Sequence, residues 1–248
     1  LPGGSSLLAE DADVREAYPV LDTTAAGYAT GYGMSKWAGE VLLRNAHEAF
    51  GLPVSIFRCG MILAHSRYAG QLNLPDMFTR LLLSISLTGL APATFYREGV
   101  SSPHYDGLPV DFMAGAINEL GLHARSGIQT FHVVNPHDDG VSMDTFVDWI
   151  AATGRQISRI ADYADWLDRF TTALKALPEH QRQRTSLPLL HSIQKQERGH
   201  ALVPASRFRE GIRQRGLGED GDIPHLSATL IAKYLRDLEV TSMLPESI

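Results

Sequence analysis

The feature that most constrains the fold is an amphipathic helical pattern that runs straight into a β-rich stretch. Across residues 33–50, apolar side chains recur at spacings of three and four, which places them on one face of a helix. They are Met34, Trp37, Ala38, Val41, Leu42, Ala46, Ala49 and Phe50. Gly51 and Pro53 end the pattern, as glycine and proline commonly do. The next stretch, Val54–Cys59, is typical of a buried parallel strand, so this order of elements indicates an α/β fold.

The rest of the first half continues the alternation of helix and strand. Helical patterns occur at residues 75–87 and 108–120, and residues 130–134 predict a second strand. Residues 1–31 are rich in small and polar side chains and lack a sustained period, so we expect them to be mostly loop. We therefore predict part of a Rossmann-type, doubly wound parallel sheet.

After Gly140 the signals for strands become scarce. Helical patterns follow near residues 160–175, 186–195, 204–215 and 225–239. This change predicts two domains. Residues 1–140 would form the C-terminal part of the Rossmann domain, and residues 141–248 a mainly helical subdomain that serves as a lid or lines the substrate site.

Charge and hydropathy exclude several classes of partner. The 248 residues carry a formal net charge of −6, so no basic field is expected to hold nucleic acid or an anionic membrane. The longest apolar stretch, residues 81–90, is interrupted by polar side chains and is shorter than the roughly 18 residues of a membrane span. The single cysteine, Cys59, excludes an internal disulfide and fits a reducing compartment. We therefore expect a cytoplasmic protein, and the loop-like opening at Leu1, without Met, indicates a piece of a longer one.

The pattern with chemical meaning is Tyr32-x-x-x-Lys36, at the start of the first helix. Residues four apart on a helix lie on the same face, with their Cβ atoms about 5–6 Å apart. An ammonium beside a phenol favours the phenolate, so such a phenol can exchange a proton with a carbonyl oxygen. The lysine can also hold the ribose hydroxyls of a nicotinamide cofactor. We predict that Tyr32 and Lys36 are catalytic and bind the cofactor.

Tyr and Lys at this spacing also occur by chance on solvent-facing helices. Here the pair follows a loop rich in small residues, has Gly31, Gly33 and Ser35 as neighbours, and lies on a helix that leads into a strand. Small neighbours let a flat cofactor approach the backbone closely. This context favours the chemical interpretation.

Several longer stretches resemble the thioester reductase domain of bacterial carboxylic acid reductases, within the extended short-chain dehydrogenase/reductase superfamily. The resemblance is carried by residues 31–44 (GYGMSKWAGEVLLR), 57–64 (FRCGMILA) and 68–73 (YAGQLN). It extends through residues 106–110, 131–140, 208–209 and 223–225. It covers almost the whole chain and is much more specific than Tyr-x-x-x-Lys alone.

The resemblance implies a terminal reductase domain that follows an adenylation and an acyl-carrier domain in one polypeptide. It implies that NADPH reduces an acyl thioester, held on the carrier's phosphopantetheine arm, to an aldehyde. Tyr32 would be the proton donor, and Lys36 its electrostatic partner and the ribose anchor. The backbone that meets the nicotinamide end matches Cys59, Gly60, Met61 and Ile62. Asp111 matches a superfamily position that orders a helix, and we assign it no catalytic role.

The sequence departs from the family before Tyr32. A complete member begins with a strand and a Gly-x-x-Gly-x-x-Gly turn that cradles the cofactor pyrophosphate, and carries a catalytic Ser or Thr on a strand upstream of the tyrosine. Neither is found here, since Gly3, Gly4, Ser5 and Ser6 lie in loop-like sequence. We therefore expect the chain alone to bind dinucleotide weakly or not at all and to be inactive.

Other polar residues have both a chemical and a structural interpretation. His137-Asp138-Asp139 resembles a metal-ligand cluster, but three adjacent ligands do not easily face one ion, so a polar loop without metal is favoured. Cys59 lacks a His or Asp companion at a recognisable spacing, so we expect a packed structural thiol rather than a nucleophile. Arg58 would bind either a phosphate or, as arginines at strand ends more often do, a carboxylate.

Two larger groups also leave alternatives open. The aromatic group consists of Trp149, Tyr163, Trp166 and Phe170. It either faces a substrate or, as its helical spacing favours, packs in the core. The basic stretch at residues 181–184, with Lys195 and Arg198, forms either a solvated face or a dock for an acidic carrier domain or its phosphopantetheine phosphate.

Two other functions share these residues. A nucleotide-sugar epimerase or dehydratase of the extended type also uses Tyr-x-x-x-Lys, and a non-catalytic reductase-like module would keep the fold for binding only. The long stretches above argue against the first, and the presence of Tyr32 and Lys36 argues against the second. The choice of NADPH rests on the resemblance alone, because the residues that select the cofactor lie upstream.

Overall fold

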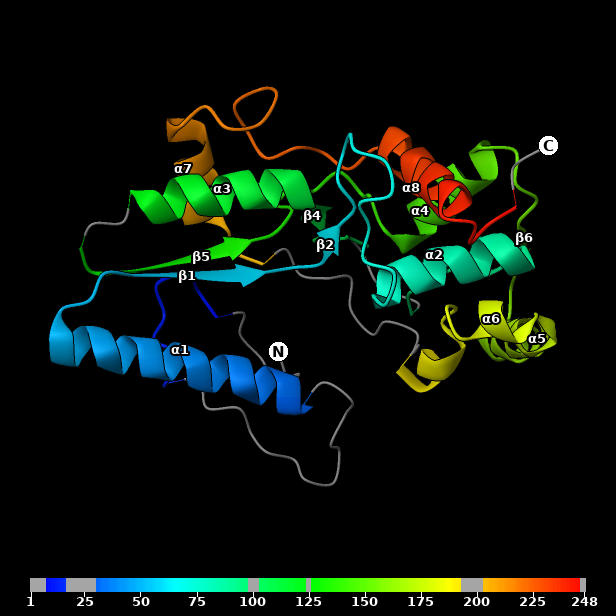
Figure 1. Ribbon diagram of the computed structural model, residues 1–248, viewed down its shortest axis with the longest axis horizontal. Coiled ribbons are helices and arrows are strands. Elements are labelled where there is room, and N and C mark those ends of the chain that lie inside the picture. The colour runs from blue at the N-terminus through cyan, green and yellow to red at the C-terminus, as the bar shows by residue number, and fades with distance from the viewer. Residues whose placement is uncertain (1–7, 17–29, 98–102, 124–125, 193–202, 246–248) are drawn as a thin grey trace. The chain divides into compact units, whose positions relative to one another are not determined.

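The computed structural model describes residues 8–16, 30–97, 103–123, 126–192 and 203–245 of the chain, drawn in colour in Figure 1. The chain divides into two compact units. The first comprises residues 1–61, 112–136 and 203–224, and the second comprises residues 62–111, 137–202 and 225–248. The division at residue 140 does not coincide with these units, because the chain passes repeatedly from one to the other. The predicted division into two domains at residue 140 therefore stays a prediction.

The first unit is built on two parallel strands. β1 (Val54–Cys59) pairs with β5 (Ile128–Val133), in a register that places Val54 opposite Ile128 and Cys59 opposite Val133. Figure 1 shows α1 (Thr30–Phe50) on one side of this pair, and α3 (Val110–Leu122) and α7 (Ser206–Gln214) on the other. Helices on both faces of a parallel pair confirm the predicted α/β, Rossmann-type fold.

The core of the first unit follows from the burial of the two strands. β1 alternates, with Val54 and Ile56 buried, whereas β5 is buried at every residue from Thr130 to Val133. On the face of the strand pair away from α1, helices α3 and α7 pack closely together. A Cβ on Gly211 of α7 would lie 2.7 Å from Leu120 Cδ2 of α3. Only glycine fits at this helix crossing without displacing its neighbour.

The second unit holds two further parallel pairs. β2 (Ile62–Leu63) pairs with β4 (Leu108–Pro109), and β3 (Leu90–Pro92) pairs with β6 (Ser158–Ile160). Its helical segments are α2 (Met77–Thr88), α4 (Met143–Ala152), α5 (Tyr163–Ala176), α6 (Glu179–Arg182), the 3₁₀ helix η1 (Leu187–Ser192) and α8 (Ala228–Val240). The mainly helical subdomain predicted for residues 141–248 does not coincide with this unit, since α7 belongs to the first unit, and it stays a prediction.

Local signals account for where several helices begin and end. The Asp76 side chain accepts a hydrogen bond from Phe78 N at 2.7 Å and starts α2, and Gly89 ends it with φ of 66°. The helix expected to begin at residue 108 instead begins at residue 110, because Leu108 and Pro109 pair with β2. The pattern at residues 186–195 forms a 3₁₀ helix to Ser192, and residues beyond it lie outside the described ones.

The first helix also begins earlier than its pattern indicated, since α1 includes Thr30 and Gly31. Residues 8–16, expected to be loop, form turns, and the rest of the expected N-terminal loop up to residue 29 lies outside the described residues. None of the described helices combines the length and apolar character needed to cross a bilayer.

Candidate active site

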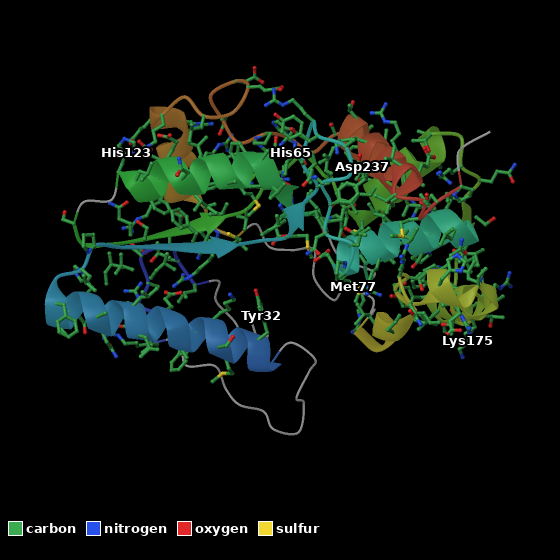
Figure 2. The ribbon with its side chains drawn as sticks, viewed as in Figure 1. Tyr32, His65, Met77, His123, Lys175 and Asp237 are labelled. Carbon is green, nitrogen blue, oxygen red and sulfur yellow. The ribbon has the colours of Figure 1, made fainter. Side chains whose placement is uncertain are left out.

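Tyr32 and Lys36 lie together on the exposed amino-terminal turns of α1. The Lys36 ammonium nitrogen lies 5.2 Å from the centroid of the Tyr32 ring, as expected for residues one helical turn apart. Tyr32 is 68% exposed, and Figure 2 shows its side chain projecting on the side of α1 where β1 lies. The ammonium lies over the face of the ring, and no hydrogen bond joins it to a described side chain. The two groups predicted to act together are therefore neighbours.

Among the described residues, none fills the space beside the glycines near this pair. A Cβ built on Gly31, Gly33 or Gly39 would meet no atom within 4 Å. The Ser35 hydroxyl is turned back onto its own helix, where it donates to Tyr32 O at 2.7 Å. Small side chains therefore leave this end of α1 accessible to a large planar ligand.

Later turns of α1 fix the helix in the first unit. Trp37 Nε1 donates to Val14 O at 3.0 Å, and Glu40 and Arg44 are buried. Glu40 forms a two-pronged ion pair with Arg58 of β1, in which Arg58 Nε donates to Glu40 Oε2 at 3.0 Å and Arg58 Nη2 donates to Oε1. A bidentate, nearly buried pair is geometrically specific. It therefore holds α1 against β1.

This ion pair also decides between the two interpretations of Arg58. The guanidinium binds a carboxylate, as expected, and its Nη1 lies 3.1 Å from His132 Nε2. Burial lowers the pKa of His132, and the Arg58 charge lowers it further, although the contact with Pro204 O opposes both. Arg58 is thus engaged within the protein.

The carboxyl end of β1 carries three of the four residues predicted to meet the nicotinamide. Cys59 is the last residue of β1, and Gly60 N donates to Val133 O at 3.1 Å, so the backbone stays beside β5 for one more residue. Met61 follows and is half-buried. Ile62, the fourth predicted residue, begins β2 in the second unit and is 48% exposed.

Cys59 corrects one expectation. It is exposed among the described residues rather than packed, because it is the last residue of the strand. Nevertheless, protein atoms around the sulfur displace enough water to raise the pKa of the Cys59 thiol, and the Lys36 ammonium opposes that shift. The thiol therefore has little nucleophilic character, and the electrostatic influence of Lys36 extends to the end of β1.

In the second unit, two acidic side chains bind groups that sequence reasoning did not connect with them. Asp111, in the first turn of α3, accepts hydrogen bonds from Ser66 N at 2.9 Å and from the Ser66 hydroxyl. Asp139 Oδ2 lies 2.8 Å from His225 Nδ1, and the His225 ring stacks on His137 with centroids 3.6 Å apart. The available sequence signal was only that both residues come shortly after strands, Asp111 at the start of a helix and Asp139 in a polar loop.

These acidic groups are ion-pairing and hydrogen-bonding partners. Burial alone would raise the pKa of Asp139, but hydrogen bonds from His225 and Val141 outweigh it and leave the pKa lowered. No three His, Cys, Asp or Glu side chains of the described segments are arranged to hold a metal ion.

The aromatic group packs as its spacing favoured. Trp166 and Phe170 are completely buried and stack with ring centroids 5.0 Å apart, whereas Trp149 is half-buried. In the basic stretch, Arg184 Nη1 lies 2.9 Å from Met243 Sδ, and Lys195 and Arg198 lie outside the described residues.

The chain is similar to known reductases over almost its whole length. Residues 12–117 match a family of nicotinamide-dinucleotide-binding domains described as male sterility protein. A carboxylic acid reductase of Mycobacterium marinum is 51% identical over 96% of this chain, and one of Mycobacterium tuberculosis is 50% identical over 95%. The chain spans 21% of the length of each. The crystal structure of the reductase (R) domain of a nonribosomal peptide synthetase from Mycobacterium tuberculosis matches with a TM-score of 0.88 and 45% identity, over 96% of this chain and 57% of that one.

The fold and the family match thus place the chain among the nicotinamide-dependent domains of the extended short-chain dehydrogenase/reductase class. Within that class, the chain belongs to the family of reductase domains found in carboxylic acid reductases and nonribosomal peptide synthetases.

Proposed function

We propose that this chain takes part in the NADPH-dependent reduction of a carrier-bound acyl thioester to an aldehyde, as the terminal reductase domain of a carboxylic acid reductase. The observation that carries the proposal is the Tyr32–Lys36 pair, whose members adjoin one another on the exposed end of a helix held against β1. Identity of about half to named carboxylic acid reductases supports the choice of reaction.

The proposed chemistry needs a proton at one atom and fixed positions for the reactants. A bound nicotinamide supplies the hydride to the thioester carbon. The Tyr32 hydroxyl gives its proton to the carbonyl oxygen, and the resulting hemithioacetal releases an aldehyde and a free thiol. The Lys36 ammonium stabilises the phenolate left on Tyr32 and holds the ribose hydroxyls.

The residues present fit a nicotinamide at this place. The glycines near Tyr32 leave room, Lys36 provides a cation, and Cys59, Gly60 and Met61 offer backbone at the carboxyl end of β1, where open α/β sheets bind their ligands. We propose Ile62, at the start of the next strand, as the fourth residue of this set. The preference for NADPH is part of the proposal and rests on the family.

The proposed partners are an adenylation domain and an acyl-carrier domain of the same polypeptide, with phosphopantetheine presenting the acyl group. The chain's share of its relatives' length, about a fifth, is consistent with such an arrangement. We propose the cytoplasm as its location. A nucleotide-sugar epimerase is disfavoured because the relatives that are about 50% identical over almost the whole of this chain are named reductases.

The test is a turnover assay on the longer polypeptide that contains this chain. With an acyl thioester and NADPH, we expect one NADPH oxidised for each aldehyde and each thiol released, and no turnover of a nucleotide sugar. Conversion of a nucleotide sugar without net oxidation of cofactor would establish the epimerase alternative instead. Tight NADPH binding with no turnover of either substrate would indicate a binding module.

A further inference from the structure

The short loop that follows β2, residues 64–70, is anchored at its first residue by the buried Tyr234. Residues 64–70 leave β2 at the carboxyl end of the β2–β4 pair, the edge at which parallel strands place ligand-binding loops. At its base, Ala64 N donates to Tyr234 Oη at 2.8 Å, and Tyr234 is almost completely buried. The loop therefore starts from a fixed point.

Asp111 fixes the middle of this loop. Asp111 is the second residue after β4, so its carboxylate lies at the same edge, where both its oxygens accept hydrogen bonds from Ser66. Burial alone would raise the pKa of Asp111, but the hydrogen bonds from Ser66 outweigh it and leave the pKa lowered. The carboxylate is thus ionised at neutral pH, and the two bonds are charge-assisted.

His65 holds the next two residues of the loop. Its Nδ1 accepts hydrogen bonds from Arg67 N at 3.0 Å and Tyr68 N at 3.1 Å, and its ring stacks on the Tyr68 ring with centroids 4.4 Å apart. Figure 2 labels His65 at this loop. The backbone of Arg67 and Tyr68 is therefore held by the imidazole.

The side chains carried on this fixed backbone are exposed. Tyr68 is 66% exposed, with one face of its ring covered by His65. Arg67 is exposed, and its guanidinium forms no hydrogen bond or ion pair with another residue in the described segments. A cation on an ordered backbone loses less conformational freedom when it binds an anion than one on a flexible loop. The planar guanidinium of an arginine can donate two parallel hydrogen bonds to two oxygens of one phosphate.

We propose that Arg67 binds the phosphate of the phosphopantetheine arm, that Tyr68 packs against the arm, and that Asp111 is the positioning residue that holds both in place. The proposal rests on the proposed function, which supplies a substrate with one phosphate at the end of a long, otherwise uncharged arm. Arg67 would select for that phosphate in a protein whose net charge of −6 otherwise repels anions.

The same phosphate chemistry is present on NADPH, so the experiment separates the two sources. The longer polypeptide is assayed with two free substrates that carry the same acyl group, acyl-phosphopantetheine and acyl-pantetheine. We expect Arg67→Ala to raise KM about tenfold for acyl-phosphopantetheine, because a charge-assisted bond to phosphate is lost. The KM for acyl-pantetheine, the KM for NADPH and kcat should each change less than about twofold.

A matched control is Arg169→Ala. Arg169 is also an exposed arginine of the second unit, but it pairs with Asp165 on its own helix at 2.8 Å. It should leave all four constants unchanged. An equal rise for both substrates on Arg67→Ala, no rise for either, or a rise in the KM for NADPH would overturn the assignment of Arg67.

Asp111 is tested by its coupling to Arg67. Asp111→Ala should also raise KM for acyl-phosphopantetheine, and the double variant should be no worse than Arg67→Ala alone, because both changes remove one interaction. If the KM increases of the two single variants multiply in the double variant, Asp111 does not act through Arg67 and the positioning role is rejected. If Asp111→Ala does not fold, Ser66→Ala removes one of the two bonds and should give the same non-additive result to a smaller degree.

Failure of the proposed function gives a different result. If the unsubstituted polypeptide reduces neither thioester, the reaction itself is wrong. If it reduces both and Arg67→Ala does not distinguish them, only the phosphate site is wrong.

Discussion

Helices α1 and α5 look alike as sequences, since both carry aromatic and apolar residues at helical spacing, but they use those residues in opposite ways. On α5, Trp166, Phe170 and Leu174 are completely buried. On α1, Tyr32, Leu42 and Phe50 are between 67% and 78% exposed among the described residues. The contrast separates side chains that serve packing from side chains that are available for chemistry or for further contacts.

The buried faces of the two helices differ as well. α5 is held by stacked rings, whereas α1 buries Glu40 and Arg44 and is held by the ion pair to Arg58 and by the indole hydrogen bond of Trp37. Directional bonds fix a helix by geometry and not only by area. This explains how α1 can keep its amino-terminal turns open and still hold Tyr32 in a defined position.

The largest expected effect on stability is on α5. Trp166→Ala should lower the free energy of unfolding by about 3–5 kcal/mol, because it opens a cavity in a closed core. Trp166→Phe is the matched control and should cost under about 1.5 kcal/mol, since the ring stack is kept and an indole N–H without a partner among the described residues is removed. Urea titration measures both, and equal costs would show that the ring is not packed as described.

The next largest effect concerns activity rather than stability. Lys36→Met in the longer polypeptide should lower kcat/KM for thioester reduction about 100-fold, with no measurable change in melting temperature, because Lys36 is exposed. Lys175→Met, on the exposed side of α5, is the control and should alter neither quantity. A large loss of stability in the Lys36 variant would mean that the ammonium is structural.

The ion pair between Glu40 and Arg58 should have an intermediate effect. Glu40→Gln removes the charge that binds Arg58 and should destabilise the protein by about 2 kcal/mol, since a nearly buried guanidinium loses its counter-charge. Asp165→Asn breaks the exposed pair with Arg169 on α5 and should cost no more than about 0.5 kcal/mol. Thermal unfolding of the two variants compares them directly, and a similar cost for both would contradict the role given to the Glu40–Arg58 pair.

The smallest effect is expected on the open face of α1. Leu42→Ala should change the stability of this chain by no more than about 0.5 kcal/mol, because Leu42 is 67% exposed. A cost above about 2 kcal/mol would show that residues outside the described ones cover this face. The small cost would strengthen the contrast with the buried Leu174, and the large cost would remove it.

Local chemistry explains which parts of this account were predictable. The strand Val54–Cys59 was predicted at both ends, because Pro53 and Gly60 flank it, and the proximity of Tyr32 and Lys36 follows from helix geometry alone. The exposure of Cys59 was not predictable, since it depends on what surrounds the end of β1.

Contacts between distant segments were missed for the same reason. Glu10 accepts hydrogen bonds from His132 N and from Phe208 N at the start of α7, and Asp111 binds Ser66 from across the β2–β4 pair. No period or spacing in the sequence encodes such contacts, because they join residues that only the completed fold brings together.

The most direct test of the account is Tyr32→Phe in the longer polypeptide, measured as aldehyde formed in a single turnover and as melting temperature. We predict a loss of at least about 100-fold in the rate of aldehyde formation with an unchanged melting temperature, because the substitution removes only an exposed hydroxyl, the one that donates the proton. An unchanged rate would contradict it.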